Sequence, residues 1–260
     1  MVFKLPYRID IEKAAKNKQS NIVLALDFPF EKPERREALF LEAERILKEV
    51  NQYVCAVKIN HHLVLPLGVF DGVQKLVKQA HEFGLMTIMD CKVNDIGATN
   101  QAIAEYYYEA GFEALIANPF IGWEEGLKPI FDVANRLQRG VILLTYMSHK
   151  AADEGYGQTI LETETGQRTL QYVSFAKKAL KYNADGVIVG ATYPEKIKEI
   201  HTILGAKVPI YSPGIGAQGG EITAALKAGA RYLIVGRAIV QAENPADVAR
   251  EIRDLARNSS

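Results

Sequence analysis

The fold is decided by the stretch Leu85–Ala110, which reads LMTIMDCKVNDIGATNQAIAEYYYEA. It opens with a mostly apolar run, Leu85–Lys92, and continues after a short polar turn into a helical pattern over Ala98–Ala110. A short apolar run followed by a helix is typical of a strand that is buried on both faces of a parallel sheet. The stretch therefore predicts one strand–helix unit of an α/β protein.

The same unit recurs along the whole chain. Apolar runs, each followed by a helical pattern, occupy residues 21–27, 53–60, 85–92, 113–118, 140–145, 185–190, 208–211 and 231–235. A closed barrel has eight strand–helix units in about 250 residues, which matches both the number of units and the length of this chain. An open doubly wound sheet usually needs only about five or six strands. We therefore expect a single-domain (β/α)8 TIM barrel.

No Gly/Ser-rich or Pro-rich linker divides the chain, so the expected domain covers residues 1–260. Residues 1–20 precede the first strand and form a short N-terminal extension. The polar segment 149–168, between the fifth strand and its helix, is too long for an ordinary turn. It is either a mobile lid or a surface insertion, and the sequence favours neither.

Composition excludes several classes of protein. The chain has 31 basic and 31 acidic residues among 260, which opposes nucleic-acid binding. Its two cysteines, Cys55 and Cys91, form no Cys-x-x-Cys pair, which indicates a reducing compartment and no zinc site. We find neither a secretory leader nor the roughly 18 uninterrupted apolar residues of a membrane helix. We expect a cytoplasmic protein with no membrane partner.

Charged residues end three successive apolar runs. Side chains alternate along a strand, so Asp27, Lys58, Asp90 and Lys92, here named the charged cluster, point toward one barrel mouth, and Asp95 follows in the next turn. Taken singly, each residue is better explained as part of a salt bridge at the rim. Taken together they favour a functional site, because desolvating opposite charges is costly unless each is paired.

Glycine-rich sequence follows the last two strands. Ser212–Gly220 reads SPGIGAQGG, and Gly236-Arg237 follows the eighth strand, which is the usual phosphate site of these barrels. Backbone N–H groups, the Arg237 guanidinium and the Gln218 amide could all bind phosphate oxygens. The spacing also matches a dinucleotide fingerprint, but no acidic residue ends the following strand, so we do not expect a nicotinamide cofactor.

These motifs resemble those of the orotidine 5′-phosphate decarboxylase family. Residues 90–96, DCKVNDI, fit the family signature Asp-x-Lys-x-x-Asp-Ile, and ATN at 98–100 continues it. Further segments follow in the family's order: LALD at 24–27, VKI at 57–59, TYMS at 145–148, SPGIGAQGG at 212–220 and VGRAI at 235–239. The sequence departs at Gly97, where the family commonly has proline.

The resemblance implies a decarboxylase that converts orotidine 5′-phosphate to uridine 5′-phosphate and CO₂ in de novo pyrimidine biosynthesis. It implies electrostatic stabilisation of a carbanion at C6 and needs no metal or other cofactor. Lys92 would protonate that carbon, and Asp90 would lie beside the departing carboxylate. Lys58 and Asp95 would complete the network of alternating charges.

The resemblance also implies the substrate contacts and a homodimer. In the family the second aspartate of the signature enters the neighbouring subunit's site, so Asp95 and Thr99 would be shared across the interface. The implied substrate-binding residues are Asp27, Ile96, Thr99, Ser148, Pro213, Gln218, Gly236 and Arg237.

Two alternatives remain. A related branch, the keto-gulonate phosphate decarboxylases and hexulose phosphate synthases, shares the Asp-x-Lys-x-x-Asp motif but uses magnesium and has glutamate at the end of the second strand. Lys58 at that position opposes a divalent cation. The other alternative is a catalytically silent barrel that binds a phosphate ligand, against which the intact Asp90, Lys92 and Asp95 argue.

Overall fold

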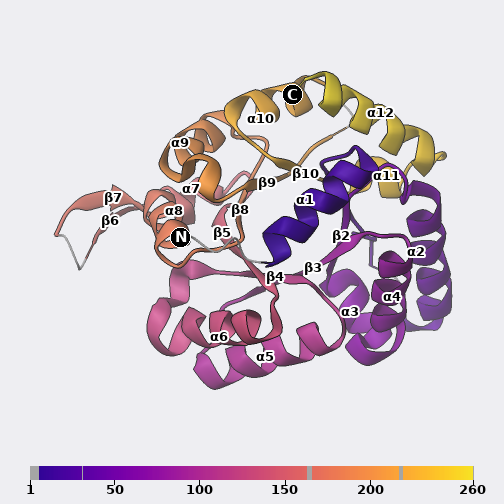
Figure 1. Ribbon diagram of the computed structural model, residues 1–260, viewed down its shortest axis with the longest axis horizontal. Helices are drawn as coiled ribbons and strands as arrows, with labels where there is room; N and C mark the ends of the chain where they lie inside the picture. The colour runs from indigo at the N-terminus through magenta and orange to yellow at the C-terminus, as the bar shows by residue number, and fades with distance from the viewer. Residues whose placement is uncertain (1–5, 31, 163–165, 217–218, 260) are drawn as a thin grey trace.

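The computed structural model describes residues 6–30, 32–162, 166–216 and 219–259. Parallel strands close into a barrel in the order β1-β10-β9-β8-β5-β4-β3-β2 (Figure 1). Their bounds are β1 Ile22–Ala25, β2 Ala56–Asn60, β3 Met86–Val93, β4 Ala114–Ala117, β5 Gly140–Tyr146, β8 Gly186–Val189, β9 Ile210–Pro213 and β10 Tyr232–Val235. Val23 pairs with both Ala56 and Ile234, which closes the ring. The predicted (β/α)8 TIM barrel is confirmed.

Helices cover the outside of the barrel between successive strands (Figure 1). In α2, Leu39, Ala43 and Ile46 recur at helical spacing and are buried against the strands, while the opposite face is charged. The covering segments are η1 Pro33–Arg35, α2 Arg36–Val50, α3 His61–Leu67, η2 Gly68–Val73, α4 Gln74–Glu82, α5 Gly97–Glu109, η3 Pro119–Ile121, η4 Trp123–Leu127, α6 Lys128–Leu137, α8 Gln171–Lys181, α9 Pro194–Leu204, η5 Gly205–Lys207, α10 Gly219–Ala228, α11 Arg237–Val240 and α12 Pro245–Asn258.

The alternation of side chains along the strands divides the core into two layers. Ile22 and Leu24 pack outward against the helices, and Val23 and Ala25 pack inward with the other interior residues of the barrel. The interior is filled below the mouth by large rings, including the stacked pair Tyr211 and Tyr232, whose centroids are 4.6 Å apart. Packed interior layers leave the open end of the barrel as the place for a ligand.

Helix α1 (Pro6–Lys18), within the N-terminal extension, closes the amino end of the barrel. Figure 1 shows it lying across the ring of strands, and its Tyr7 and Ile11 join the interior core. Arg8 donates hydrogen bonds to the carbonyl oxygens of Asn183, Ala184 and Lys207. Its Nε also lies 3.4 Å from the buried carboxylate of Asp185. The carboxyl end of the strands therefore provides the open mouth.

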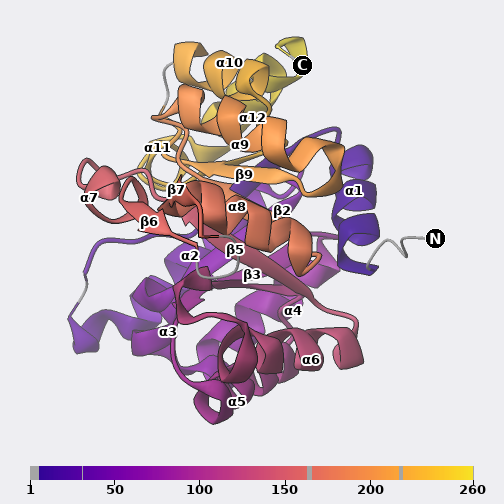
Figure 2. The ribbon, with the colours of Figure 1, turned by 90° about the vertical axis from the view of Figure 1, so that its left-hand side faces the viewer.

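The predicted long loop 149–168 contains a short helix, α7 (Ala152–Tyr156), and most of a two-stranded antiparallel hairpin. Its strands are β6 (Thr159–Leu161) and β7 (Arg168–Leu170), and Figures 1 and 2 show them at the periphery, outside the barrel. Leu161 is 65% exposed, so the hairpin lacks a core of its own.

In the described ranges we find no helix with the length and apolarity needed to cross a bilayer.

Candidate active site

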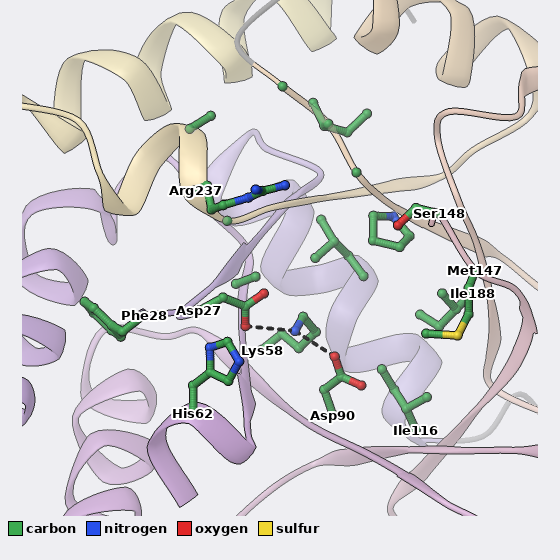
Figure 3. Close-up of a pocket in the computed structure, with 18 of the residues that line it drawn as sticks. Asp27, Phe28, Lys58, His62, Asp90, Ile116, Met147, Ser148, Ile188 and Arg237 are labelled. Carbon is green, nitrogen blue, oxygen red and sulfur yellow. Dashed lines mark hydrogen bonds and ion pairs between the residues drawn. The ribbon is translucent and has the colours of Figure 1, made fainter. Parts of the chain in front are cut away.

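A cavity of about 950 Å³ opens at the carboxyl ends of the barrel strands. Eight of the predicted site residues line it: Asp27, Lys58, Asp90, Lys92, Ser148, Pro213, Gly236 and Arg237. They come from five different strands or the turns that follow them, β1, β2, β3, β5 and β9, together with the start of α11 after β10. In the view of Figure 3, Arg237 and Ser148 border the cavity from opposite sides, with Lys58 and Asp90 between them.

The charged cluster forms one continuous chain of ion pairs. The Nζ atom of Lys58 lies 2.7 Å from Oδ2 of Asp90 and 3.3 Å from Oδ1 of Asp27. The other oxygen of Asp90, Oδ1, lies 2.6 Å from Nζ of Lys92. Figure 3 shows the two contacts of Lys58 as dashed lines. The signs alternate from Asp27 to Lys92, so every charge has an opposite neighbour.

Burial differs along this chain of charges. Lys58 is 4% exposed and Asp90 is 7% exposed, whereas the side chain of Lys92 is 38% exposed and lines the cavity. Lys58 thus holds the network together from within the barrel. Lys92 is the cation of the cluster that is open to a ligand.

Mutual pairing keeps Lys58 and Asp90 ionised despite their burial. Burial alone would lower the pKa of Lys58, but the carboxylates of Asp90 and Asp27 outweigh it and raise that pKa above its usual value. Burial alone would raise the pKa of Asp90, but the ammonium groups of Lys58 and Lys92 hold it below its usual value. Both groups are charged at neutral pH.

The backbone of Lys92 takes an unusual conformation. Its φ angle is +47°, and the register between β3 and β4 shifts between Met89 and Val93. A left-handed non-glycine residue is strained by about 1 kcal/mol or more, and such strain tends to gather at functional sites. As predicted, Asp90 and Lys92 line the cavity while Cys91 packs against the outer core.

Sequence reasoning missed Asn60, which ends β2, and His62, in the first turn of α3. Asn60 Nδ2 donates a 2.7 Å hydrogen bond to Oδ1 of Asp27, and Asn60 Oδ1 accepts from the backbone N–H of His62 at 2.8 Å. Asn60 therefore orients Asp27 and also caps α3. His62 lines the cavity near Asp27 (Figure 3). The available signal was that Asn60 lies two positions after Lys58, on the same face of the strand.

The glycine-rich segment lines the cavity, with Gly214 next to Ser148. Gly214 has a φ of +93°, and the N–H of Gly216 donates to Oε2 of Glu221 at 2.9 Å. Glu221, in the first turn of α10, also lines the cavity and was not predicted. The predicted phosphate ligand Gln218 lies outside the described residues.

Three predicted site residues do not reach this cavity. Among the described residues that form its wall, Asp95, Ile96 and Thr99 are absent. All three are exposed: Asp95 and Ile96 directly precede α5, where Asp95 Oδ1 accepts from the N–H of Ile96 at 2.7 Å, and Thr99 lies in the first turn of α5. Ile96 is 72% exposed. Within a single chain, the structure therefore separates these residues from the charged cluster.

Apolar side chains form part of the remaining wall, on the side of Asp90 and Ser148. In Figure 3 Ile116, Met147 and Ile188 lie together there.

In the part of the chain that the structure describes, we find no group of three or more His, Cys, Asp or Glu side chains placed to hold a metal ion.

Comparisons with known sequences agree on one family. A sequence model described as "Orotidine 5′-phosphate decarboxylase / HUMPS family" matches residues 20–252. The orotidine 5′-phosphate decarboxylase of Pyrococcus abyssi is 37% identical over 236 residues, which cover 91% of this chain and 99% of the relative. The protein of the same name from Methanosarcina acetivorans is 34% identical over 233 residues, covering 90% and 93%.

Solved structures give the same result. A crystal structure of orotidine 5′-phosphate decarboxylase from Pyrococcus horikoshii superposes with a TM-score of 0.71 at 34% identity, covering 91% of this chain and 99% of that one. The enzyme from Methanocaldococcus jannaschii, complexed with the inhibitor BMP, gives a TM-score of 0.72 at 32% identity, covering 91% and 98%.

Proposed function

The chain belongs to the orotidine 5′-phosphate decarboxylase / HUMPS family, and from that membership we propose that it is a carboxy-lyase converting orotidine 5′-phosphate to uridine 5′-phosphate and CO₂. In this proposal it serves de novo pyrimidine biosynthesis. The observation that carries the proposal is the ammonium of Lys92, which is held 2.6 Å from Asp90 and lines the same cavity as Arg237.

Decarboxylation at this carbon demands electrostatic stabilisation. When the bond between C6 and the carboxylate breaks, CO₂ leaves and the electron pair remains on an sp² ring carbon. A fixed positive charge beside that carbon stabilises the developing carbanion, and it does so best in a site that excludes water. Lys92 provides this charge and then transfers one of its protons to C6, after which the neutral amine regains a proton from solvent.

The other members of the charged cluster position Lys92 and act on the substrate. Asp90 places negative charge beside the substrate carboxylate, and this repulsion is relieved as CO₂ departs. Lys58 holds Asp90 through its 2.7 Å contact and keeps both carboxylate partners fixed. Lys58 lies between Asp27 and Asp90, and Lys92 also pairs with Asp90, so two ammonium groups balance the two carboxylates without a divalent cation.

Groups remote from the reacting carbon bind the nucleotide. Arg237, Gly236 and Gln218 bind the phosphate, and Pro213 lines the pocket beside them. Asp27 binds a ribose hydroxyl, and Ser148 hydrogen-bonds the pyrimidine. Phosphate binding supplies free energy that orders the charged cluster around the substrate.

Asp95 and Thr99 act in the site of a second subunit. Their exposure outside their own cavity supports a homodimer, because a partner that covers the start of α5 would receive them. Large apolar side chains on neighbouring elements are also exposed: Leu65 is 78% and Phe70 50% exposed. The ring centroid of Phe70 is 6.0 Å from that of Tyr106 on α5, which is itself 57% exposed. Burying such a patch stabilises association.

A direct assay tests the proposal. We expect the purified protein to consume orotidine 5′-phosphate, followed by the change in its ultraviolet absorbance, and to release one CO₂ for each uridine 5′-phosphate. The rate should be unchanged by a metal chelator. Absence of turnover would contradict the proposed reaction, and a rate abolished by the chelator and restored by magnesium would favour the magnesium-dependent branch instead.

A further inference from the structure

The segment Gly190–Tyr193, which follows β8, joins the two sides of the cavity wall. The N–H of Gly190 donates to the carbonyl oxygen of Tyr146 at 2.9 Å, and the N–H of Ala191 donates to that of Pro213 at 2.8 Å. Tyr146 lies two residues before Ser148, and Pro213 directly precedes Gly214 in the glycine-rich segment. Residues Gly190–Tyr193 have no part in the proposed decarboxylation.

Two side-chain hydroxyls of this segment hold the backbone around Ser148. Thr192 Oγ1 donates to the carbonyl oxygen of Ser148 at 3.2 Å, and the hydroxyl of Tyr193 donates to that of His149 at 3.0 Å. These carbonyls are consecutive, so the first hydrogen bond fixes the peptide plane that directly follows Ser148 and the second fixes the next plane along the chain.

Close packing fixes Ser148 from two further sides. A Cβ atom added to Gly190 would lie 2.6 Å from Cα of Ser148, so no other residue fits there without moving the backbone. A Cβ added to Gly214 would lie 3.1 Å from Cβ of Ser148, and the φ of +93° at Gly214 also favours glycine. Ser148 is therefore enclosed by backbone on both sides.

The hydroxyl of Tyr193 is itself held in place. Its ring packs edge-on against Tyr146, with centroids 5.1 Å apart and an interplanar angle of 74°. Tyr146 is 1% exposed and donates its own hydroxyl to Asp153 on α7 at 3.1 Å. Because the half-buried ring of Tyr193 packs against the buried ring of Tyr146, its hydroxyl has less freedom than that of an ordinary surface side chain.

We propose that Thr192 and Tyr193 are positioning residues that aim the Ser148 hydroxyl into the cavity by fixing the backbone of Ser148 and His149. This rests on the proposed function, in which Ser148 contacts the pyrimidine. A displacement of about 1 Å in a positioning group can lower a rate by about 10²-fold, so loss of two backbone anchors has a measurable effect on turnover.

The test is a double-mutant cycle. Thr192→Val keeps the branched side chain and Tyr193→Phe keeps the ring, so both remove only a hydroxyl. We expect the two changes together to lower kcat/KM for orotidine 5′-phosphate about tenfold. In a Ser148→Ala background the same changes should lower kcat/KM by less than about twofold, because the group that they aim is gone.

Thr202→Val is the matched control, since the hydroxyl of Thr202 on α9 donates to the carbonyl of Lys198 at 2.9 Å, one helical turn away. It should leave kcat/KM unchanged. Unchanged activity in the Thr192/Tyr193 double variant overturns the inference, and so does an equal loss with and without Ser148. If the double variant fails to fold, Tyr193→Phe alone is compared in the wild-type and Ser148→Ala backgrounds, and the same two outcomes support or overturn the inference. A wild-type protein without decarboxylase activity contradicts the proposed function instead, and with it the premise of the inference.

Discussion

Lys58 shows how one buried residue can organise a site. An unpaired ammonium at 4% exposure would be strongly disfavoured, but two carboxylates at 2.7 and 3.3 Å satisfy it. Removing one partner from a buried ion pair destabilises a protein by about 3–5 kcal/mol, because the remaining charge is left without compensation. The charged cluster therefore resists rearrangement and presents Lys92 in one position.

The lowered pKa of Asp90 predicts a specific pH dependence of stability. A carboxyl group whose pKa is lower in the folded than in the unfolded state stabilises the protein above the unfolded value, and this contribution is lost as the pH falls through the folded value. The wild type should therefore lose stability below about pH 4. The free energy of unfolding of Asp90→Asn, measured by denaturant titration from pH 7 to pH 3, should fall less steeply over the same range.

Asp71→Asn provides the control for that measurement. Asp71 also pairs with a lysine, at 2.8 Å from Lys75 Nζ, but its side chain is 76% exposed. An exposed ion pair contributes about 0–1 kcal/mol, so this variant should follow the wild-type curve. Identical pH profiles for Asp90→Asn and the wild type would show that Asp90 is not held ionised by its neighbours.

Arg237→Ala should chiefly weaken substrate binding. A hydrogen bond to a charged group contributes about 1.5–3 kcal/mol, so we expect KM for orotidine 5′-phosphate to rise about 10- to 100-fold. Steady-state kinetics measures this change. Arg250→Ala, whose guanidinium pairs with Asp247 on the exposed face of α12, should leave KM as it is. An unchanged KM in Arg237→Ala would refute the phosphate role.

Charged residues at strand ends were predictable from the sequence, but hydrogen bonds to the segments that follow the strands were not. Asp27, Lys58, Asp90 and Lys92 follow apolar runs, and strand alternation alone places them on one side. Asn60, at the end of β2, and Glu221, in the first turn of α10, escaped prediction because their hydrogen-bond partners lie in the segments that follow β1 and β9. A turn has no side-chain period from which its geometry can be predicted.

At the scale of elements, the position of α1 across the amino end of the barrel could not be predicted from the periodicity of apolar residues. The helix presents only a small apolar surface, with Tyr7, Ile11 and Ala14 buried, because it closes one end of the barrel instead of covering its side. The sequence therefore indicated only an extension. The hairpin β6–β7 was likewise not predicted, because its residues are exposed or half-buried and show no apolar alternation.

Arg8→Ala should destabilise the protein by about 3–5 kcal/mol without affecting the active site directly. The change leaves the carboxylate of Asp185, whose side chain is 2% exposed, without its cation. Chemical denaturation measures the effect. Lys13→Ala on the same helix, where the lysine side chain is 68% exposed, should change stability by less than about 0.5 kcal/mol. Equal stabilities of the two variants would contradict the role of α1 as a closing element.

Gly97 gives a second example at this scale. A Cβ atom there would lie 3.0 Å from the carbonyl oxygen of Glu125, so the start of α5 approaches η4 closely. The departure from the family's proline thus has a packing explanation that depends on a contact with a distant segment. Sequence alone could identify the departure but not its neighbour.

At the scale of the whole molecule, the barrel was predictable because its unit recurs along the chain and its strands are buried on both faces. The proposed role of Asp95 in a functional site rests on family resemblance alone, because the single chain places that residue outside its own cavity. A site completed by a second copy has no signature in the periodicity of one chain.

Mixing two inactive variants tests the shared site. Lys92→Ala and Asp95→Ala chains, each inactive alone, should recover about a quarter of wild-type turnover after exchange in equal amounts. Half of the dimers would then be hybrids, and each hybrid would carry one complete site. Sedimentation or native mass spectrometry of the mixture establishes that exchange has occurred. No recovered activity in a mixture with demonstrated hybrids would rule out a site shared through Asp95.

In the proposed reaction the Lys92 ammonium stabilises and protonates the carbon that loses CO₂. The most direct measurement is the turnover number of Lys92→Ala for orotidine 5′-phosphate, with Lys75→Ala as a surface lysine control and thermal unfolding to verify the fold. We predict a loss of at least about 10³-fold in Lys92→Ala, with the fold intact and the control fully active. A folded Lys92→Ala protein with near-normal turnover would contradict the account.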